Sequence, residues 1–136
     1  MDPALIDTDT LSEVMKGRDP QVREKARQYL AIHGRFNFSI ITRYEILRGL
    51  KVKQALQQIA AFEARCGQSN VLPLTDEIID LAAGLYADLY TRGQLISDAD
   101  ILVAATGLIH RLPVVTENPA HFNRIPGLRV ESWRTG

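Results

Sequence analysis

Short apolar segments alternate along this chain with longer segments in which apolar residues recur every three or four positions. The first apolar segment, residues 4–6, predicts a strand, and the spacing of apolar residues over 11–15 predicts a helix after it. A second helix is expected to begin at Pro20, because proline suits a first turn, and to end at Gly34. The chain is therefore predicted to open with one strand and two helices.

The next segment, residues 36–41, is aromatic and β-branched, which predicts a second strand. Thr42 is expected to open the following helix, and Gly49 to interrupt or end it. A further helix is predicted from about residue 52 to 64, ending near Gly67. This part of the chain thus predicts one strand and two helices.

The remaining predicted elements are a strand at 71–74, a helix capped by Thr75 and closed by Gly93, a helix at 97–110, a strand at 113–115, one helical turn at 120–124 and a strand at 128–130. The helix at 97–110 is apolar on nearly every side, so it is expected to be buried in the core. Strands that alternate with helices predict an α/β fold with a parallel sheet covered on both faces.

Length and composition narrow the function classes. We expect residues 1–136 to form a single domain, because the chain is too short for a second one. Lys and Arg together number 16, as do Asp and Glu, so a nucleic-acid partner would have to meet a local basic patch. The single cysteine, Cys66, excludes an intramolecular disulfide. Without an export signal or a membrane-spanning apolar run, a soluble cytoplasmic protein is expected.

Acidic residues fall where the predicted strands end. Asp7 follows the first strand, and Glu45 lies in the first turn of the helix after the second strand. Asp98 and Asp100 open the buried helix, and Asn118 follows the fourth strand. Because the working residues of such sheets lie beyond the carboxyl ends of the strands, these side chains form the candidate active site.

The chemistry of these side chains indicates a metal. Carboxylates gathered without His or Cys are hard oxygen ligands, which suit Mg²⁺ or Mn²⁺ better than zinc or copper. A divalent cation would also remove the repulsion between crowded carboxylates. Such an ion can polarise a phosphodiester, orient the attacking water and lower its pKa. Phosphodiester hydrolysis is therefore the reaction that this set of ligands favours.

Each acid also has a purely structural explanation. Thr42 and Glu45 have the spacing of a helix capping box, as do Ser97 and Asp100. Asp7 and Asp9 could simply favour a helix N-terminus through the helix dipole. The functional interpretation therefore depends on the joint placement of these acids and not on any one of them.

Four segments resemble the motifs of PIN-domain nucleases of the VapC kind. Residues 5–9 (LIDTD) and 39–49 (SIITRYEILRG) are similar to the first two motifs of that family. Residues 93–105 (GQLISDADILVAA) resemble the third motif, and 114–122 (VVTENPAHF) resemble the last strand and its loop. The motifs occur in the family's order over nearly the whole chain, which makes the combination specific.

The resemblance implies a PIN-like α/β/α sandwich with a short, mostly parallel central sheet, and Mg²⁺- or Mn²⁺-dependent endoribonuclease activity. It implies that Asp7, Glu45 and Asp100 are the catalytic residues and metal ligands. The positions expected to support these ligands are Thr8, Asp98, Thr116 and Asn118. The usual setting in this family is the toxin of a type II toxin–antitoxin pair, a homodimer that cleaves RNA and is silenced by a cognate antitoxin.

Asn118 departs from the pattern of many PIN nucleases, which carry a fourth acid after the fourth strand. An amide can bind a metal-bound water but brings no charge, so one ion and two ions both stay open. Arg43, Arg48 and Lys51 lie around and after Glu45 and are candidates to hold RNA phosphates near the metal. A solvated helix face explains these basic residues equally well.

Two other function classes fit parts of the pattern. Residues 6–9 place two acids after a strand, as in haloacid-dehalogenase-type phosphatases, but the later Gly-Asp run of that family is absent. A receiver-like binding module also gathers acids at strand ends, but its phosphoacceptor Asp would fall at 71–74, where the chain has none. A PIN fold that serves only as a protein-binding scaffold remains an alternative.

Overall fold

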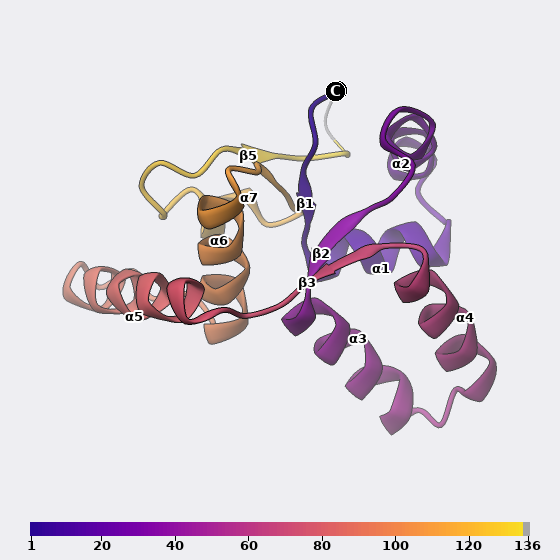
Figure 1. Cartoon of the computed structure of the whole chain (residues 1–136), viewed down its shortest axis with the longest axis horizontal. Helices are drawn as coiled ribbons and strands as arrows, with labels where there is room; N and C mark the ends of the chain where they lie inside the picture. Colours follow the sequence, from indigo (N-terminus) through magenta and orange to yellow (C-terminus); the bar gives the residue numbers. More distant parts are fainter. Residues whose placement is uncertain (135–136) are drawn as a thin grey trace.

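The computed structural model describes residues 1–134, so positions 135 and 136 of the predicted single domain lie outside the described residues. The strands of this part are β1 Leu5–Ile6, β2 Asn37–Ser39, β3 Asn70–Leu72, β4 Val114–Val115 and β5 Val130–Glu131. The helices are α1 Thr8–Lys16, α2 Pro20–His33, α3 Ile40–Val52, α4 Leu56–Gly67, α5 Asp76–Thr91, α6 Asp98–His110 and α7 Pro119–Phe122 (Figure 1).

The strands form one sheet in the order β3-β2-β1-β4-β5, and every neighbouring pair is parallel. Leu5 of the central strand pairs with Asn37 on one side and Val114 on the other. The parallel sheet expected from the sequence is confirmed. Because all strands run in the same direction, the residues that follow them are delivered to the same edge of the sheet.

The two faces of the sheet bury separate apolar clusters. Leu5 and Val114 belong to the cluster that contains the buried residues of α5 and α6, whereas Ile6 and Val115 belong to the cluster with α1, α2 and Phe62 of α4. Successive side chains of a strand point to opposite faces, so two-residue strands serve both clusters. Figure 1 shows α5 and α6 on one side of the central strands and α1, α2 and α4 on the other. This arrangement is the predicted α/β/α sandwich.

Helix α6 is the buried helix that its composition predicted. Its residues Val103 to Thr106 are at most 2% exposed, and Gly107 is buried. Gly107 allows α6 to approach β4 closely, because a Cβ at this position would lie 3.1 Å from Val114 Cγ2 and from the Leu112 carbonyl oxygen. The carboxyl-terminal part of α6 is thereby held against β4.

The prediction for residues 36–41 is wrong at its carboxyl end. Helix α3 begins at Ile40, and Ser39 is its cap, with the Ser39 hydroxyl accepting from the Ile41 N–H at 3.1 Å. Thr42 is fully buried inside the helix and does not cap it. The strand preference of two adjacent isoleucines is weak compared with a well-formed cap and tertiary packing.

The other boundary errors are small. Helix α3 passes through Gly49, which faces open space, at a cost of about 1 kcal/mol relative to alanine. Helix α4 begins at Leu56 instead of residue 52, and the strands predicted at 71–74 and 128–130 are displaced by one or two residues. Packing of the neighbouring turns, such as burial of Ile46, holds α3 together across the glycine.

Candidate metal centre

Asp7 lies directly after β1 and is 3% exposed. It caps α1, because its Oδ1 accepts from the Thr10 N–H at 3.0 Å. Its Oδ2 accepts from the Thr116 hydroxyl at 2.5 Å, across the sheet from the end of β4. The capping interpretation is therefore correct for Oδ1 of Asp7. Its Oδ2 is held instead by Thr116, the residue that follows β4.

Burial governs the charge state of Asp7. Desolvation raises the pKa of this carboxyl from 3.8 to about 6, even though the hydrogen bonds from Thr116 and Thr10 oppose the shift and Asp9 adds to it. A buried carboxylate with a raised pKa gains stability when a cation approaches it. Asp7 thus has the electrostatic character expected of a metal ligand.

Glu45 lies in α3 and reaches the first turn of α1. Its Oε1 accepts from the Thr8 hydroxyl at 2.6 Å, and that hydroxyl lies 3.1 Å from the Thr42 hydroxyl oxygen. Arg48 Nη2 lies 3.7 Å from Glu45 Oε2. Since Thr8 is the neighbour of Asp7 in the chain, the structure brings Glu45 to the edge where Asp7 lies.

The segment after β4 completes a chain of hydrogen bonds. The Thr116 hydroxyl, which donates to Asp7, accepts from the Asn118 N–H at 2.9 Å. The Asn118 side-chain amide donates to Asp9 Oδ2 at 2.6 Å. Asp9 is not among the site residues expected from the sequence, although its place two residues after Asp7 is a usable signal.

Asp100 is tied to the same segment through a histidine. Its N–H donates to the Ser97 hydroxyl at 3.1 Å, so half of the predicted capping box is confirmed. Its Oδ2 lies 3.3 Å from His121 Nδ1, and His121 is in α7, three residues after Asn118. Asp98, in the first turn of α6, is exposed. Nothing in the sequence pairs Asp100 with His121, because a lone histidine has no characteristic spacing.

The predicted RNA-binding residues have different surroundings. Arg43 Nη2 donates to both carboxylate oxygens of Glu63, at 3.2 and 3.3 Å. The Arg48 guanidinium lies over the Tyr44 ring, 5.2 Å from its centre, and Lys51 is exposed. The charge of Arg48 is thus partly balanced by Glu45, a candidate site residue, whereas that of Arg43 is partly balanced by Glu63, away from the candidate site residues.

Within residues 1–134, no three acidic, histidine or cysteine side chains lie close enough together to form a ready-made cation site. The donor chemistry nevertheless fits a hard divalent cation. Asp7 is a desolvated carboxylate, and Glu45 and Asp100 offer further carboxylate oxygens, each held by a hydrogen-bonding neighbour. Asp7, Glu45 and Asp100 therefore supply the type of donor atom that a hard divalent cation prefers, but the structure does not gather the three carboxylates into one cluster.

Across residues 1–134, no helix combines the length and the apolar character that a bilayer crossing requires.

Comparison with known proteins agrees with the fold and with the order of the motifs. The family model described as "PIN domain" matches residues 4–128. "Ribonuclease VapC1" of Methanocaldococcus jannaschii is 34% identical over 94 residues, which cover 68% of this chain and 67% of the relative. "tRNA(fMet)-specific endonuclease VapC" of Salmonella typhimurium is 27% identical over 130 residues, which cover 95% of this chain and 96% of the relative.

A solved structure extends this agreement to three dimensions. The crystal structure of DNA-bound VapBC from Salmonella typhimurium contains a chain that matches with a TM-score of 0.86 and 27% identity, covering 98% of this chain and 99% of that one. PIN-domain nucleases generally depend on divalent metals. The resemblance seen in the sequence is confirmed, and the chain belongs to the PIN-domain family.

Proposed function

We propose that this chain is a divalent-metal-dependent endoribonuclease and the toxin of a type II toxin–antitoxin pair. One observation carries the proposal. The buried carboxylate of Asp7 accepts hydrogen bonds from the Thr10 N–H and the Thr116 hydroxyl at the edge of the sheet where Glu45 accepts from the Thr8 hydroxyl. The Salmonella typhimurium and Methanocaldococcus jannaschii relatives, which are named as an endonuclease and a ribonuclease, support RNA as the substrate.

In this proposal Asp7, Glu45 and Asp100 hold Mg²⁺ or Mn²⁺ directly. When bound, the ion would polarise the scissile phosphate and lower the pKa of the attacking water. Thr8 and Thr116 position Glu45 and Asp7 through their hydroxyls, and the remaining supporting positions are Asn118 and Asp98.

Binding of RNA is assigned to the basic residues that adjoin Glu45. Arg48 is the best placed, because it lies between the Tyr44 ring and the Glu45 carboxylate. Lys51 is exposed, and Arg43 would have to leave Glu63 to contact a phosphate. We further propose that residues 1–136 act as one domain, in the cytoplasm where the RNA substrate is found.

The experiment that tests this function is brief induction of the protein in cells, followed by sequencing of RNA ends. Wild-type protein should produce new ends at a small set of sites, and the Asp100→Asn variant at similar abundance should produce none. Equal patterns of RNA ends from the two proteins would reject the nuclease and favour a PIN fold that serves only to bind a partner.

We also propose that two copies associate through α5. Ile79, Tyr86 and Tyr90 are 45%, 43% and 67% exposed on this helix, and the two tyrosine rings stack with centroids 6.3 Å apart. A two-fold axis beside α5 would bring the same exposed apolar side chains of both copies together and remove them from water.

This dimer can be tested by replacing both tyrosines. The pair Tyr86→Glu and Tyr90→Glu should convert a dimer to a monomer in light scattering, since it places four charges in a small contact. Ile32→Glu, at an exposed apolar residue of α2, is the matched control and should leave a dimer. A dimer that survives the double change would place the interface elsewhere.

The antitoxin is proposed to occupy a groove of about 500 Å³ between α1 and the α3–α4 hairpin. Met15, Ile46 and Leu50 contribute apolar side chains to this groove, and Lys16 and Lys53 contribute positive charge. Such a groove fits a peptide segment with apolar anchors and acidic flanks. The structural neighbour is a VapBC complex, which supports an antitoxin partner for this chain.

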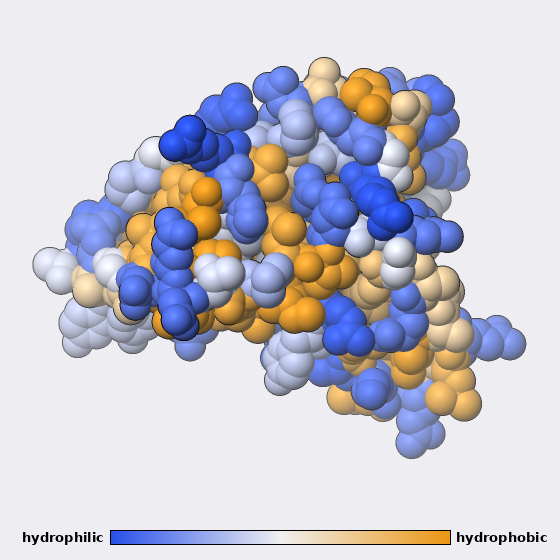
Figure 2. Space-filling view, viewed as in Figure 1, coloured by the Kyte–Doolittle hydropathy of each residue, from blue (hydrophilic) through white to orange (hydrophobic). Residues whose placement is uncertain are grey.

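Apolar surface continues beside this groove. Val52 and Leu56, at the turn between α3 and α4, are 83% and 78% exposed. Figure 2 shows hydrophobic surface at the lower right, where Figure 1 places this turn. A partner that extended along the α3–α4 hairpin would cover these side chains.

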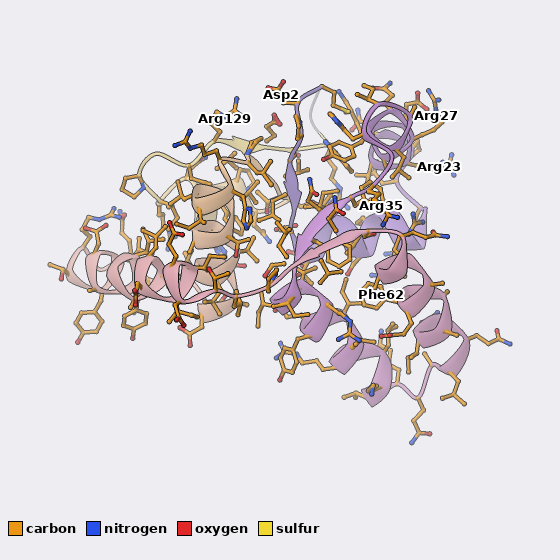
Figure 3. The ribbon with its side chains drawn as sticks, in the orientation of Figure 1. Asp2, Arg23, Arg27, Arg35, Phe62 and Arg129 are labelled. Atoms are coloured by element: carbon orange, nitrogen blue, oxygen red, sulfur yellow. The ribbon has the colours of Figure 1, made fainter. Side chains whose placement is uncertain are left out.

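Charge reversal at the groove tests the proposed antitoxin site. Lys16→Glu together with Lys53→Glu should weaken binding of the antitoxin by about tenfold or more and leave RNA cleavage active, as rim charges act on association. The control is Arg27→Glu with Arg129→Glu, two residues that Figure 3 labels along the upper edge of the molecule. If both double variants bind the antitoxin equally, the groove is not the binding site.

A further inference from the structure

Arg134 joins three carboxylates that come from three parts of the chain. Its Nε lies 3.1 Å from Asp19 Oδ2 and 3.2 Å from Glu117 Oε1, and its Nη2 lies 3.8 Å from Glu13 Oε1. Glu13 belongs to α1, Asp19 caps α2, and Glu117 follows β4. Arg18 also reaches Glu13, at 3.4 Å. One guanidinium near the carboxyl end of the chain thus ties the segment after β4 to α1 and α2.

This cluster is adjacent to the candidate metal centre. Glu117 stands in the chain between Thr116, which donates to Asp7, and Asn118, which donates to Asp9. Asp9 and Glu13 are four residues apart on α1 and so lie on the same face, one turn from each other. The bond between Asn118 and Asp9 therefore runs beside the Glu117–Arg134–Glu13 contacts.

Arg134 is the cation that balances the negative charge of Glu117. Its side chain is 13% exposed, and within residues 1–134 its Oε1 is buried without a hydrogen bond. Burial raises the pKa of Glu117, the Arg134 charge lowers it, and the negative charges of Glu13, Asp9 and Asp19 raise it. Loss of the guanidinium would leave Glu117 facing those negative charges, which would push the segment after β4 away from α1.

We propose that Arg134 is a positioning residue for the candidate metal centre, because it holds Glu117 against α1 and so keeps Thr116 and Asn118 in contact with Asp7 and Asp9. The inference rests on the proposed function, since it assigns a role in that same site. Arg134 acts only through other residues and contacts none of the three expected metal ligands.

The test measures Mn²⁺ affinity and RNA cleavage for Arg134→Gln. Both the affinity and kcat should fall by roughly tenfold, as happens when residues that orient metal ligands are changed, while KM for RNA stays within about twofold. Coulomb's law alone predicts the reverse for Mn²⁺, because removal of a positive charge near the site should tighten cation binding. The direction of the change therefore separates positioning from simple charge balance.

Three variants complete the design. Adding Glu117→Gln to Arg134→Gln should restore most of the lost Mn²⁺ affinity, because it removes the unbalanced charge. Arg134→Lys should keep most of the affinity. Arg129→Ala is the matched control: it lies on the same segment but pairs with Asp2 at 3.7 Å, and Figure 3 shows the two together at the upper edge, where β1 begins. This control should bind Mn²⁺ as wild type does.

The outcomes are distinguishable. Wild-type protein that neither binds Mn²⁺ nor cleaves RNA would reject the proposed function itself. A functional wild type with unchanged or tighter Mn²⁺ binding in Arg134→Gln, or with no recovery on adding Glu117→Gln, would overturn the role of Arg134. If Arg134→Gln does not fold by circular dichroism, Arg134→Met, which keeps the apolar stem, has the same expected results.

Discussion

Replacing Asp7 with asparagine should lower the rate of RNA cleavage by about a thousandfold, or about 4 kcal/mol in activation free energy. Asparagine keeps an oxygen that can accept from the Thr10 N–H, so the cap of α1 is retained while the negative charge is lost. Single-turnover cleavage of a labelled RNA measures the effect, and circular dichroism checks the fold. A rate within tenfold of wild type would remove Asp7 from the proposed set of metal ligands.

The same substitution should change how stability depends on pH in metal-free protein. The pKa of Asp7 is raised from 3.8 to about 6 on folding, so the folded state binds this proton more tightly than the unfolded state. The resulting stabilisation is present below pH 4 and is lost as pH rises through about 6, a change of up to about 3 kcal/mol. Asp7→Asn lacks this titration.

Urea unfolding in EDTA at pH 4 and pH 7 measures that difference. From pH 4 to pH 7, the free energy of unfolding of wild type should fall more than that of Asp7→Asn. Adding Mg²⁺ or Mn²⁺ at pH 7 should raise the free energy of unfolding of wild type and not that of Asp7→Asn. Asp98→Asn changes an exposed carboxyl and serves as the control. Parallel pH dependence in wild type and Asp7→Asn would contradict the burial argument.

Asp100→Asn should also abolish metal-dependent cleavage, whereas Asp98→Asn should only reduce it. Two residues apart on a helix, the two side chains point in directions roughly 200° apart, so they are unsuited to bind one ion together. Asp100 is the less exposed of the two, and its carboxylate lies beside His121 in the segment that leads back to Thr116 and Asn118.

Cleavage assays and Mn²⁺ titrations on both variants decide between these acids. Asp100→Asn should weaken Mn²⁺ binding by at least about tenfold, and Asp98→Asn should leave it within about threefold. His121→Gln is a useful companion, because it removes the imidazole beside Asp100 and keeps the charge of the acid. Collapse of binding at Asp98 with Asp100 spared would exchange the two roles.

Much of the fold could be predicted because apolar periodicity is a local property. The α/β alternation, the buried α6 and the placement of Asp7 at the end of β1 all follow from segments of a few residues. The start of α3 was misplaced, because Thr42 and Glu45 imitate a capping box whereas Ser39 forms the cap. In the structure Thr42 instead packs beside Thr8, which could not be known before the strands were paired.

The contacts that arrange the site are mostly distant in sequence. Asp7 and Thr116 are 109 residues apart, as are Asp9 and Asn118, so no local pattern indicates either hydrogen bond. The sequence could place these residues at one edge of the sheet through the rule for parallel strands. It could not indicate that the side-chain amide of Asn118 donates to the carboxylate of Asp9.

The most direct test of the metal-dependent nuclease is cleavage of single-stranded RNA by purified, chelator-treated protein over a series of Mg²⁺ and Mn²⁺ concentrations. We expect no cleavage in EDTA, and activity that returns with the added ion in wild type but not in Asp7→Asn or Asp100→Asn. We also expect the ion concentration for half-maximal cleavage to match the dissociation constant measured by titration. Undiminished cleavage in excess EDTA, by protein free of contaminating nuclease, would contradict it.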